Sequence, residues 1–480
     1  MDEDEALAAL ARAEGIETEW WDWQGRPRRV CRDTLRALLA ALGCDPTRPH
    51  EALDARSGPR SLPALLTART GEPLRLAVPD PTSQTIAWRI VLDSGERASG
   101  RAEVTAEEGG YFVSIPTPRA LGEGAIALGG AIDGETRIAL CPSACFLGPL
   151  ERERLWGLAV QVYGLRAPGD GGLGHYGALG AAARAAAQAG ADALMLSPTH
   201  ALFAADPAHV SPYSPSSRAQ ADGRLVDPNA LPEVAQLAEL VAATGLAVEL
   251  AALEALPLVD YRRAVPARLA LLRALFERFT AACPRGTSLA EEFAAFAREG
   301  GEPLRRHAVF EALHAERFGA DPAQWDWRSW PASFRDPTHP DVERFARERA
   351  QEISFHLFLQ WLAERGLASA QRAARRAGMR IGLIADLAVG QHPGGSRAWA
   401  RAGALLQGVT IGAPPDALNH RGQGWGLTTF APRALAAAGF APFREELRAA
   451  MRHAGGIRLD HVMGLSRIWC IPEGARPDQG

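Results

Sequence analysis

Hydrophobic and polar positions change their pattern twice along the chain. In the first sixty residues, apolar positions recur at helical spacing over 5–13 and 33–42. The next segment instead has short apolar runs separated by Gly, Pro, Asp and Ser, which is typical of β-strands. These runs cover residues 74–78, 85–92, 111–115 and 137–140. We therefore expect a helical lead-in over residues 1–60 and an antiparallel β-sandwich over residues 61–145.

In residues 146–480, β-like runs alternate with helical stretches, which predicts an α/β fold with a parallel sheet. The β-like runs are 156–163, 191–196, 246–250, 380–385, 408–411 and 456–459. Helices are expected over 178–189, 289–298, 303–318 and 342–377. Periodicity fits both an open doubly wound sheet and a (β/α)8 barrel with insertions.

Composition excludes several classes of protein. The 480 residues carry 52 basic and 56 acidic side chains, so no basic excess favours nucleic acid. Every basic residue is Arg, which removes chemistry that needs a lysine amine. The amino terminus is acidic and no run of about 18 apolar residues occurs, so we expect a cytoplasmic protein without membrane contact. The six cysteines lack paired C-x2-C spacing, which argues against a zinc site.

A glycine-rich loop, GDGGLG at 169–174, matches the dinucleotide-binding pattern G-x-G-x-x-G. An NAD-type oxidoreductase is therefore one alternative. Pro168 and Gly177 argue against it because they delay the following helix, and Asp192 begins the next strand instead of ending it. The other interpretation is a flexible loop at the top of the sheet, with Asp170 available to a ligand.

The strand-like run GIRLD at 456–460 ends in a carboxylate, and the ring base His461 follows it. Period two places Arg458 and Asp460 on one face, and a neighbouring guanidinium favours the ionised carboxylate that a nucleophile needs. The alternative is an Arg–Asp pair that only closes the end of the sheet.

Further polar and aromatic residues follow other predicted strands or lie in loops. Asp386 closes the run 380–385, and the segment SPYS at 211–214 contains Tyr213. Asp416 and the segment GQGWG at 422–426 flank another loop. Carboxylates, amides and exposed aromatic rings on one rim predict a carbohydrate site.

Four segments together resemble the 4-α-glucanotransferase family, also called amylomaltases or disproportionating enzymes. They are IRLDHVM at 457–463, GAPPD at 412–416 followed by GQGWG at 422–426, DLAVG at 386–390, and SPYS at 211–214. The amino-terminal region also resembles that of the longer bacterial members. The resemblance therefore covers nearly the whole chain.

The resemblance implies a (β/α)8 barrel that cleaves an α-1,4 bond of a maltodextrin by a retaining mechanism. Asp460 matches the nucleophile, with Arg458 and His461 as its neighbours, and no metal or cofactor is implied. The expected partners are α-1,4-glucans and maltodextrins, with glucose or maltose as acceptor. The substrate-binding residues implied are Tyr213, Ser211, Asp386, Asp416, Gln423, Trp425, Arg458 and His461.

The carboxyl-terminal segment departs from the family pattern. A retaining transfer needs a second carboxyl group about 5 to 5.5 Å from the nucleophile. The acidic residues after Asp460 are Glu473 and Asp478, and neither resembles the family's acid/base motif. We therefore expect a chain truncated within its barrel, whose acid/base lies beyond residue 480 and which alone does not disproportionate maltotriose. The alternatives are a glucan-binding chain without activity, or a related hydrolase.

Overall fold

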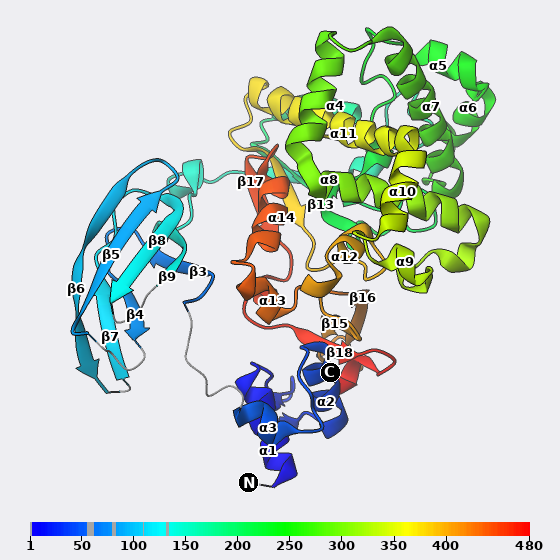
Figure 1. Cartoon of the computed structure of the whole chain (residues 1–480). Coiled ribbons are helices and arrows are strands. Elements are labelled where there is room, and N and C mark those ends of the chain that lie inside the picture. The colour runs from blue at the N-terminus through cyan, green and yellow to red at the C-terminus, as the bar shows by residue number, and fades with distance from the viewer. Residues whose placement is uncertain (1, 55–61, 79–82, 109, 131–133) are drawn as a thin grey trace. The chain divides into compact units, whose positions relative to one another are not determined.

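The computed structural model describes residues 2–54, 62–78, 83–108, 110–130 and 134–480. The chain divides into two compact units, each formed from segments that are distant in the sequence (Figure 1). Unit 1 comprises Met1–Trp21, Arg26–Arg152 and Phe430–Arg444. Unit 2 comprises Asp22–Gly25, Glu153–Thr429 and Glu445–Gly480. Within the described ranges, no helix is both long enough and apolar enough to span a membrane.

The amino-terminal part of unit 1 is helical, as the apolar spacing predicts. A capping box starts the first helix: the Asp2 carboxylate accepts from the Glu5 amide, and the Glu5 side chain accepts from the Asp2 amide. The apolar faces of the first two helices meet in a small core that contains Leu10 and Leu39. The elements are α1 (Glu3–Ala13), β1 (Glu19–Trp21), β2 (Pro27–Arg29), α2 (Arg32–Ala41) and α3 (Pro49–Asp54). Helix α13 (Pro432–Ala437) also belongs to unit 1.

Seven strands of unit 1 form one sheet in the order β3-β9-β8-β5-β6-β7-β4. Alternate residues face a shared apolar core, as period two requires, and all four predicted strands are confirmed. The edge strand β3 pairs in parallel with β9, whereas we expected only antiparallel pairing. The strands are β3 (Leu65–Arg69), β4 (Leu74–Val78), β5 (Thr85–Leu92), β6 (Arg97–Glu107), β7 (Gly110–Ile115), β8 (Gly122–Gly130) and β9 (Gly134–Cys141).

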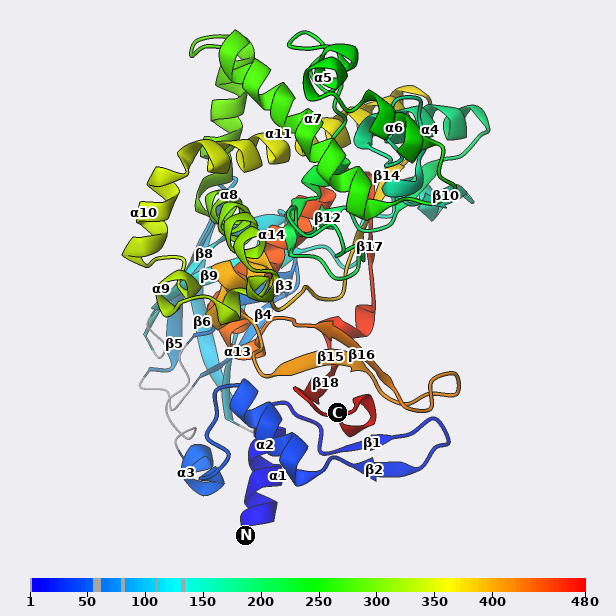
Figure 2. The same cartoon turned by 90° about the vertical axis from the view of Figure 1, so that its right-hand side faces the viewer.

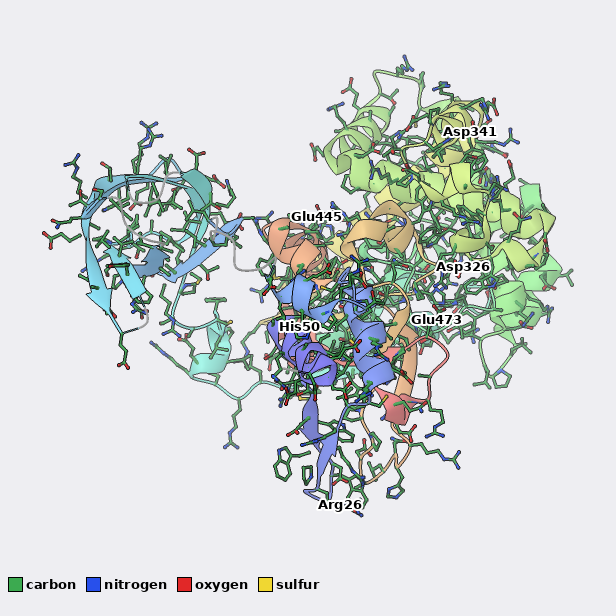
Figure 3. The ribbon with its side chains drawn as sticks, turned by 60° about the horizontal axis from the view of Figure 1, so that its bottom comes forward. Arg26, His50, Asp326, Asp341, Glu445 and Glu473 are labelled. Atoms are coloured by element: carbon green, nitrogen blue, oxygen red, sulfur yellow. The ribbon has the colours of Figure 1, made fainter. Side chains whose placement is uncertain are left out.

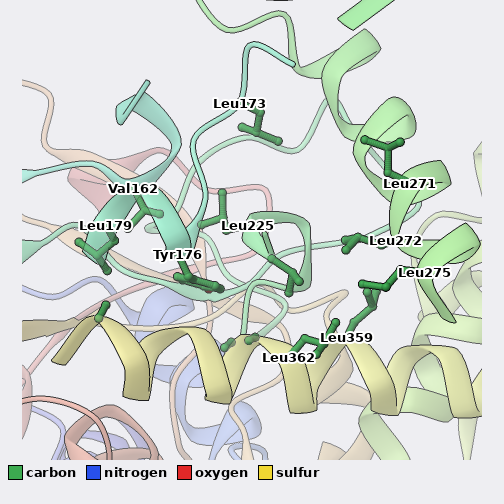
Figure 4. Packing of buried hydrophobic residues seen from close by; sticks show 14 of the residues in the cluster. Val162, Leu173, Tyr176, Leu179, Leu225, Leu271, Leu272, Leu275, Leu359 and Leu362 are labelled. Atoms are coloured by element: carbon green, nitrogen blue, oxygen red, sulfur yellow. The ribbon is translucent and has the colours of Figure 1, made fainter. Parts of the chain in front are cut away.

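Unit 2 contains a four-stranded parallel sheet in the order β10-β11-β14-β17. Its strands are β10 (Gly157–Val160), β11 (Ala193–Leu196), β14 (Gly382–Leu387) and β17 (Gly456–Leu459). Helices α4 (Tyr176–Gln188) and α11 (Ala350–Arg376) pack on one face, where a large apolar cluster includes Leu179, Tyr176 and Leu362 (Figure 4). The predicted α/β class is confirmed.

Two of the six β-like runs of unit 2 do not join this parallel sheet. Residues 246–250 belong to a helix, α6 (Ala247–Glu254), because a short apolar run fits either element and here continues as a helix. The run 408–411 is a strand, β15 (Val409–Ala413), but it pairs antiparallel with β16 (Gln423–Leu427) and β18 (Trp469–Pro472) in a separate sheet (Figure 2).

Further helices and a short hairpin complete unit 2. The prediction of one helix over 342–377 is wrong, since a break at Arg349 gives two. The predicted break between 298 and 303 is confirmed by Gly301, whose φ of 54° lies outside helical geometry. The elements are β12 (His200–Ala201), β13 (Ser217–Ala221), α5 (Leu237–Thr244), α7 (Tyr261–Ala282), α8 (Ser288–Ala320), α9 (Ala332–Arg335), α10 (Pro340–Glu348) and α12 (Ser396–Ala400). Helix α14 (Ala441–Met451) leads into β17.

Buried Arg268 of α7 holds the loop after β10 in place. Its guanidinium donates hydrogen bonds to the carbonyls of Asp170 (2.8 Å), Leu173 (2.5 Å) and Val226 (2.9 Å). Burial lowers the pKa of Arg268 to about 10, so the group stays charged at neutral pH. The loop at 169–174 is thus fixed from inside the protein.

We predict that Arg268→Leu lowers the free energy of unfolding by about 3 kcal/mol or more, because three buried carbonyls lose a charged donor. The measurement is the urea midpoint followed by circular dichroism. Arg263→Ala is the matched control on the same helix, because its pair with Glu249 is solvent-exposed and should change the midpoint far less. Equal shifts for the two variants would contradict the role of Arg268.

Candidate active site

The carboxyl ends of β14 and β17 bring together residues from distant parts of the chain. In this parallel pair Asp386 lies opposite Arg458, and the Asp460 amide donates to the Leu387 carbonyl at 3.1 Å. Strand alternation then places the side chains of Asp386, Arg458 and Asp460 on one face. These three predicted residues do form one group.

Arg458 bridges the two carboxylates. Its terminal nitrogens donate to Asp386 Oδ2 at 2.5 Å and to Asp460 Oδ1 at 2.8 Å. The Tyr213 hydroxyl, from the loop between β12 and β13, donates to the same Asp386 oxygen at 3.1 Å. A continuous hydrogen-bonded chain therefore joins Tyr213, Asp386, Arg458 and Asp460.

The two carboxylates have different surroundings. Asp386 is 4% exposed, whereas the Asp460 side chain is 25% exposed and accessible to a ligand. Burial raises the pKa of Asp386 above its usual range, although Arg458 and Tyr213 act in the opposite direction. Partial burial opposes ionisation of Arg458, but the two carboxylates raise its pKa overall. Asp460 is thus a solvent-accessible carboxylate beside a permanent cation, which is the environment of a nucleophile.

An aromatic pair involves His461, the residue directly after Asp460. The Trp425 ring packs edge-on against His461, with ring centroids 5.0 Å apart and an interplanar angle of 80°. The Trp425 indole nitrogen donates to Gln423 Oε1 at 3.3 Å. His461 has a left-handed backbone with φ 46°, uncommon for a residue with a Cβ, so the chain turns sharply directly after Asp460.

Ser211 and Asp416 were also predicted site residues, and the structure gives each a local role. The Ser211 carbonyl accepts from the Ser214 amide at 3.1 Å in a turn. Asp416 Oδ1 accepts from the amides of Leu418 (2.7 Å) and Asn419 (2.6 Å). Among the described residues, no hydrogen bond links either side chain to the Asp460 group, so their predicted substrate contacts stay predictions.

Buried residues that the sequence analysis missed hold the end of β14. Arg218 donates to the carbonyls of Ala388 (2.7 Å) and Val389 (2.9 Å), and the Ala388 amide donates to His200 Nε2 at 3.3 Å. Burial lowers the pKa of His200 to about 3, so its ring is neutral and can accept. Arg218 also pairs with Glu446 of α14 at 2.7 Å, with both side chains buried. The sequence pattern does not single them out, because β13 (SRAQA) and α14 (APFREELRAAM) each contain several polar residues.

A cluster of aromatic rings around Phe203 packs against the Tyr213 loop through His209. Phe203 contacts His209, His314 and His392, with ring centroids 4.8 to 5.4 Å apart. Glu311 of α8 is buried nearby: its Oε2 accepts from the Ala204 amide at 3.0 Å, and its Oε1 has no hydrogen-bond partner in the part of the chain described. The sequence contains no signal for these residues, because Phe203, His209 and His392 lie in segments without a periodic pattern.

The glycine loop at 169–174 does not favour the dinucleotide alternative. Asp170 accepts from the amides of Ala167 (2.8 Å) and Gly172 (2.7 Å), and the Gly171 amide donates to Glu254 Oε1 at 3.0 Å. Amides that would bind a pyrophosphate are therefore already paired within the protein. Asp192 directly precedes β11 and pairs with Arg380 at 2.6 Å. It therefore lies at the amino ends of the parallel strands, whereas Asp460 lies at their carboxyl ends.

The two acidic residues after Asp460 do not join the site. Glu473 is 70% exposed and lies 3.8 Å from Arg328, which also pairs with Asp326 (Figure 3). Asp478 pairs with Arg476 at 3.0 Å. Within the described ranges, neither contacts the Asp460 group. The structure therefore identifies neither of them as the acid/base that would protonate the leaving oxygen.

Comparison with known proteins gives a consistent result. The family model described as 4-alpha-glucanotransferase matches residues 160–480. A 4-alpha-glucanotransferase of Mycobacterium tuberculosis (strain ATCC 25618 / H37Rv) is 36% identical over 507 residues, covering 99% of this chain and 68% of the relative. The Haemophilus influenzae relative of the same name is 32% identical, covering 72% of this chain and 50% of that protein.

Solved structures agree with these sequence matches. Amylomaltase from Corynebacterium glutamicum superposes with a TM-score of 0.78 at 29% identity, covering 99% of this chain and 68% of that chain. Amylomaltase from Streptococcus agalactiae, solved in complex with acarbose, shares the fold with a TM-score of 0.56 at 17% identity. That match covers 68% of this chain and 63% of that chain.

We predict a pH-dependent stability contribution from Glu311. Burial raises its pKa from 4.5 to about 8, so the folded protein binds this proton more tightly than the unfolded chain. The contribution is complete below about pH 4.5 and is lost as the pH rises to about 8. Relative to Glu311→Gln, the wild type should lose roughly 2 to 4 kcal/mol between pH 5 and pH 8.

The measurement is the urea midpoint of both proteins at each pH. The two proteins differ only at residue 311, so the difference between them isolates the contribution of the Glu311 carboxyl group. A pH-independent difference would contradict the prediction.

Proposed function

The chain belongs to the 4-alpha-glucanotransferase family, and on that premise we propose that Asp460 is the nucleophile of a retaining transfer between α-1,4-glucans. The observation that carries the proposal is the position of Asp460: a solvent-accessible carboxylate at the end of a parallel strand, 2.8 Å from the guanidinium of Arg458. Carboxyl ends of barrel strands are where such enzymes carry their chemistry.

The reaction has two displacements. The Asp460 carboxylate attacks C1 of a glucosyl unit, the bond from C1 to the leaving oxygen breaks, and that oxygen takes up a proton. The 4-hydroxyl of an acceptor then attacks C1 and gives up its proton, and the bond to Asp460 breaks. Two inversions at C1 retain the α configuration. Arg458 holds the Asp460 carboxylate through a hydrogen bond of 2.8 Å, and the acid/base residue is left unassigned.

The surrounding residues support a sugar-binding role. Tyr213 is 39% exposed and presents its ring beside Asp386, while Trp425 and His461 form an aromatic border next to Asp460. Aromatic faces stack on the apolar faces of sugar rings. We assign maltodextrins as donors and glucose or maltose as acceptors, with Ser211, Asp416 and Gln423 as further hydroxyl contacts. The oxidoreductase and binding-only alternatives are not favoured by the family match.

We predict that a maltosyl fluoride donor forms a covalent adduct on Asp460. Fluoride leaves without protonation, so this donor tests the nucleophile separately from the acid/base residue. Intact-mass spectrometry should show the chain heavier by one maltosyl group, and digestion should place it on the peptide that contains Asp460.

Asp460→Asn should abolish this adduct, and Asp478→Asn is the matched control that should retain it, because the Asp478 carboxylate pairs with Arg476. An adduct on Asp460→Asn, or on another residue of the wild type, would contradict the assignment. Transfer activity is followed in parallel as formation of glucose and longer chains from maltotriose.

We predict unequal effects at Tyr213. Tyr213→Phe keeps the ring and removes only the hydrogen bond to Asp386, so maltoheptaose affinity should fall by less than about threefold. Tyr213→Ala removes the ring and should weaken binding about tenfold. Isothermal titration calorimetry measures both, and equal losses would mean that the hydroxyl, not the ring, binds sugar.

A further inference from the structure

The loop that carries Tyr213 has no regular secondary structure of its own. It connects β12 to β13, and its local backbone hydrogen bonds come from two turns, one closed by the Ser214 amide and the Ser211 carbonyl, the other by the His209 amide and the Asp206 carbonyl. The Tyr213 hydroxyl is held by Asp386. That contact fixes the tip of the side chain but not the backbone of residues 211–215. The position of this backbone therefore depends on contacts with other segments.

His209 provides the first of two anchors for the backbone of the Tyr213 loop. Its Nε2–H donates to the Ser214 carbonyl at 2.8 Å. The imidazole packs edge-on against Phe203, with centroids 4.8 Å apart, and against His392, with centroids 5.1 Å apart. The His209 carbonyl in turn accepts from Arg224 at 3.1 Å, and Arg224 pairs with buried Asp222. The side chain and the backbone of His209 are therefore both fixed.

A second anchor acts on the next peptide group. The His392 amide donates to the Pro215 carbonyl at 2.8 Å, and its ring Nδ1 accepts from the Gly394 amide at 3.0 Å. The His392 ring is enclosed by Phe203 and Trp325. Consecutive carbonyls, of Ser214 and Pro215, are thus held by two histidines that contact each other.

The chemistry of the bond identifies the state of the imidazole. A carbonyl can only accept, so Nε2 of His209 must carry a proton. Burial lowers the pKa of His209 below its usual value, so the ring is the neutral Nε2–H tautomer at neutral pH. A glutamine side chain places an amide N–H near the position of that nitrogen, whereas alanine leaves the carbonyl without this donor.

We propose that His209 is a positioning residue, which holds the loop 211–215 so that the Tyr213 ring presents its face to a glucan. The inference rests on the proposed function of Tyr213 and assigns a role to a residue that does not itself touch substrate. Stacking depends on the plane of the Tyr213 ring. Loss of the His209 hydrogen bond should therefore shift the loop and weaken sugar binding, even though Tyr213 is still present.

The test is a double-mutant cycle on the full chain, with maltoheptaose binding measured by calorimetry. His209→Ala should weaken binding about five- to tenfold, whereas His209→Gln should stay within about threefold of wild type. The variant with both His209→Ala and Tyr213→Ala should bind like Tyr213→Ala alone. Without the Tyr213 ring, the position of the loop no longer affects stacking on the sugar. Thermal unfolding of every variant checks that the proteins are folded.

His339→Ala is the matched control. His339 Nδ1 accepts a hydrogen bond from the Asp341 amide at the start of α10, so this variant also removes a histidine hydrogen bond. It should leave binding unchanged. Additive losses in the double variant, or equal losses for His209→Gln and His209→Ala, would overturn the role of His209 while Tyr213 keeps its own. If Tyr213→Ala binds like wild type, the sugar contact itself fails and this inference fails with it.

Discussion

The candidate site depends on one guanidinium held between two carboxylates on neighbouring parallel strands. The register of β14 and β17 places Arg458 opposite Asp386, and the same side chain reaches Asp460 two residues further along its own strand. A guanidinium between two carboxylates at adjacent strand ends offsets the repulsion between their negative charges. The register of one strand against the other therefore fixes where the Asp460 carboxylate lies relative to this cation.

Such an arrangement requires strand ends that do not move. The carbonyls after β14 are held by buried Arg218, whose charge is matched by buried Glu446 on the helix that leads into β17. A buried ion pair contributes little net stability because both groups lose their hydration. Its value here is geometric, since it connects the end of one site-bearing strand to the helix that precedes the other.

The aromatic residues of the site are supported in two ways. The Tyr213 loop is fixed by the packing of Phe203, His209 and His392, in which rings provide the contact area and single polar atoms fix the backbone. Trp425 instead lies within β16, which pairs with β15, and its ring packs against His461. Parallel strands thus carry the charges, while a supported loop and an antiparallel strand carry the aromatic surfaces.

The sequence by itself determined the elements whose pattern is local. Alternation over 74–78 and 456–459 predicted strands with the observed bounds, and it placed Arg458 and Asp460 on one face. The motifs around Tyr213, Asp386 and Trp425 identified candidate site residues through their family resemblance. A short apolar run such as 246–250 was ambiguous, because its length suits a helix as well as a strand.

Only the tertiary structure decided which of these elements meet. The pairing of Asp386 with Arg458 joins residues 72 positions apart, and the contact of Arg218 with Glu446 spans more than two hundred. The same holds for β15, whose partners lie in two other segments, and for His209, whose sequence neighbourhood gives no sign that it supports a loop. Local periodicity records which side of an element is buried, whereas the partner of that side depends on the packing of the whole unit.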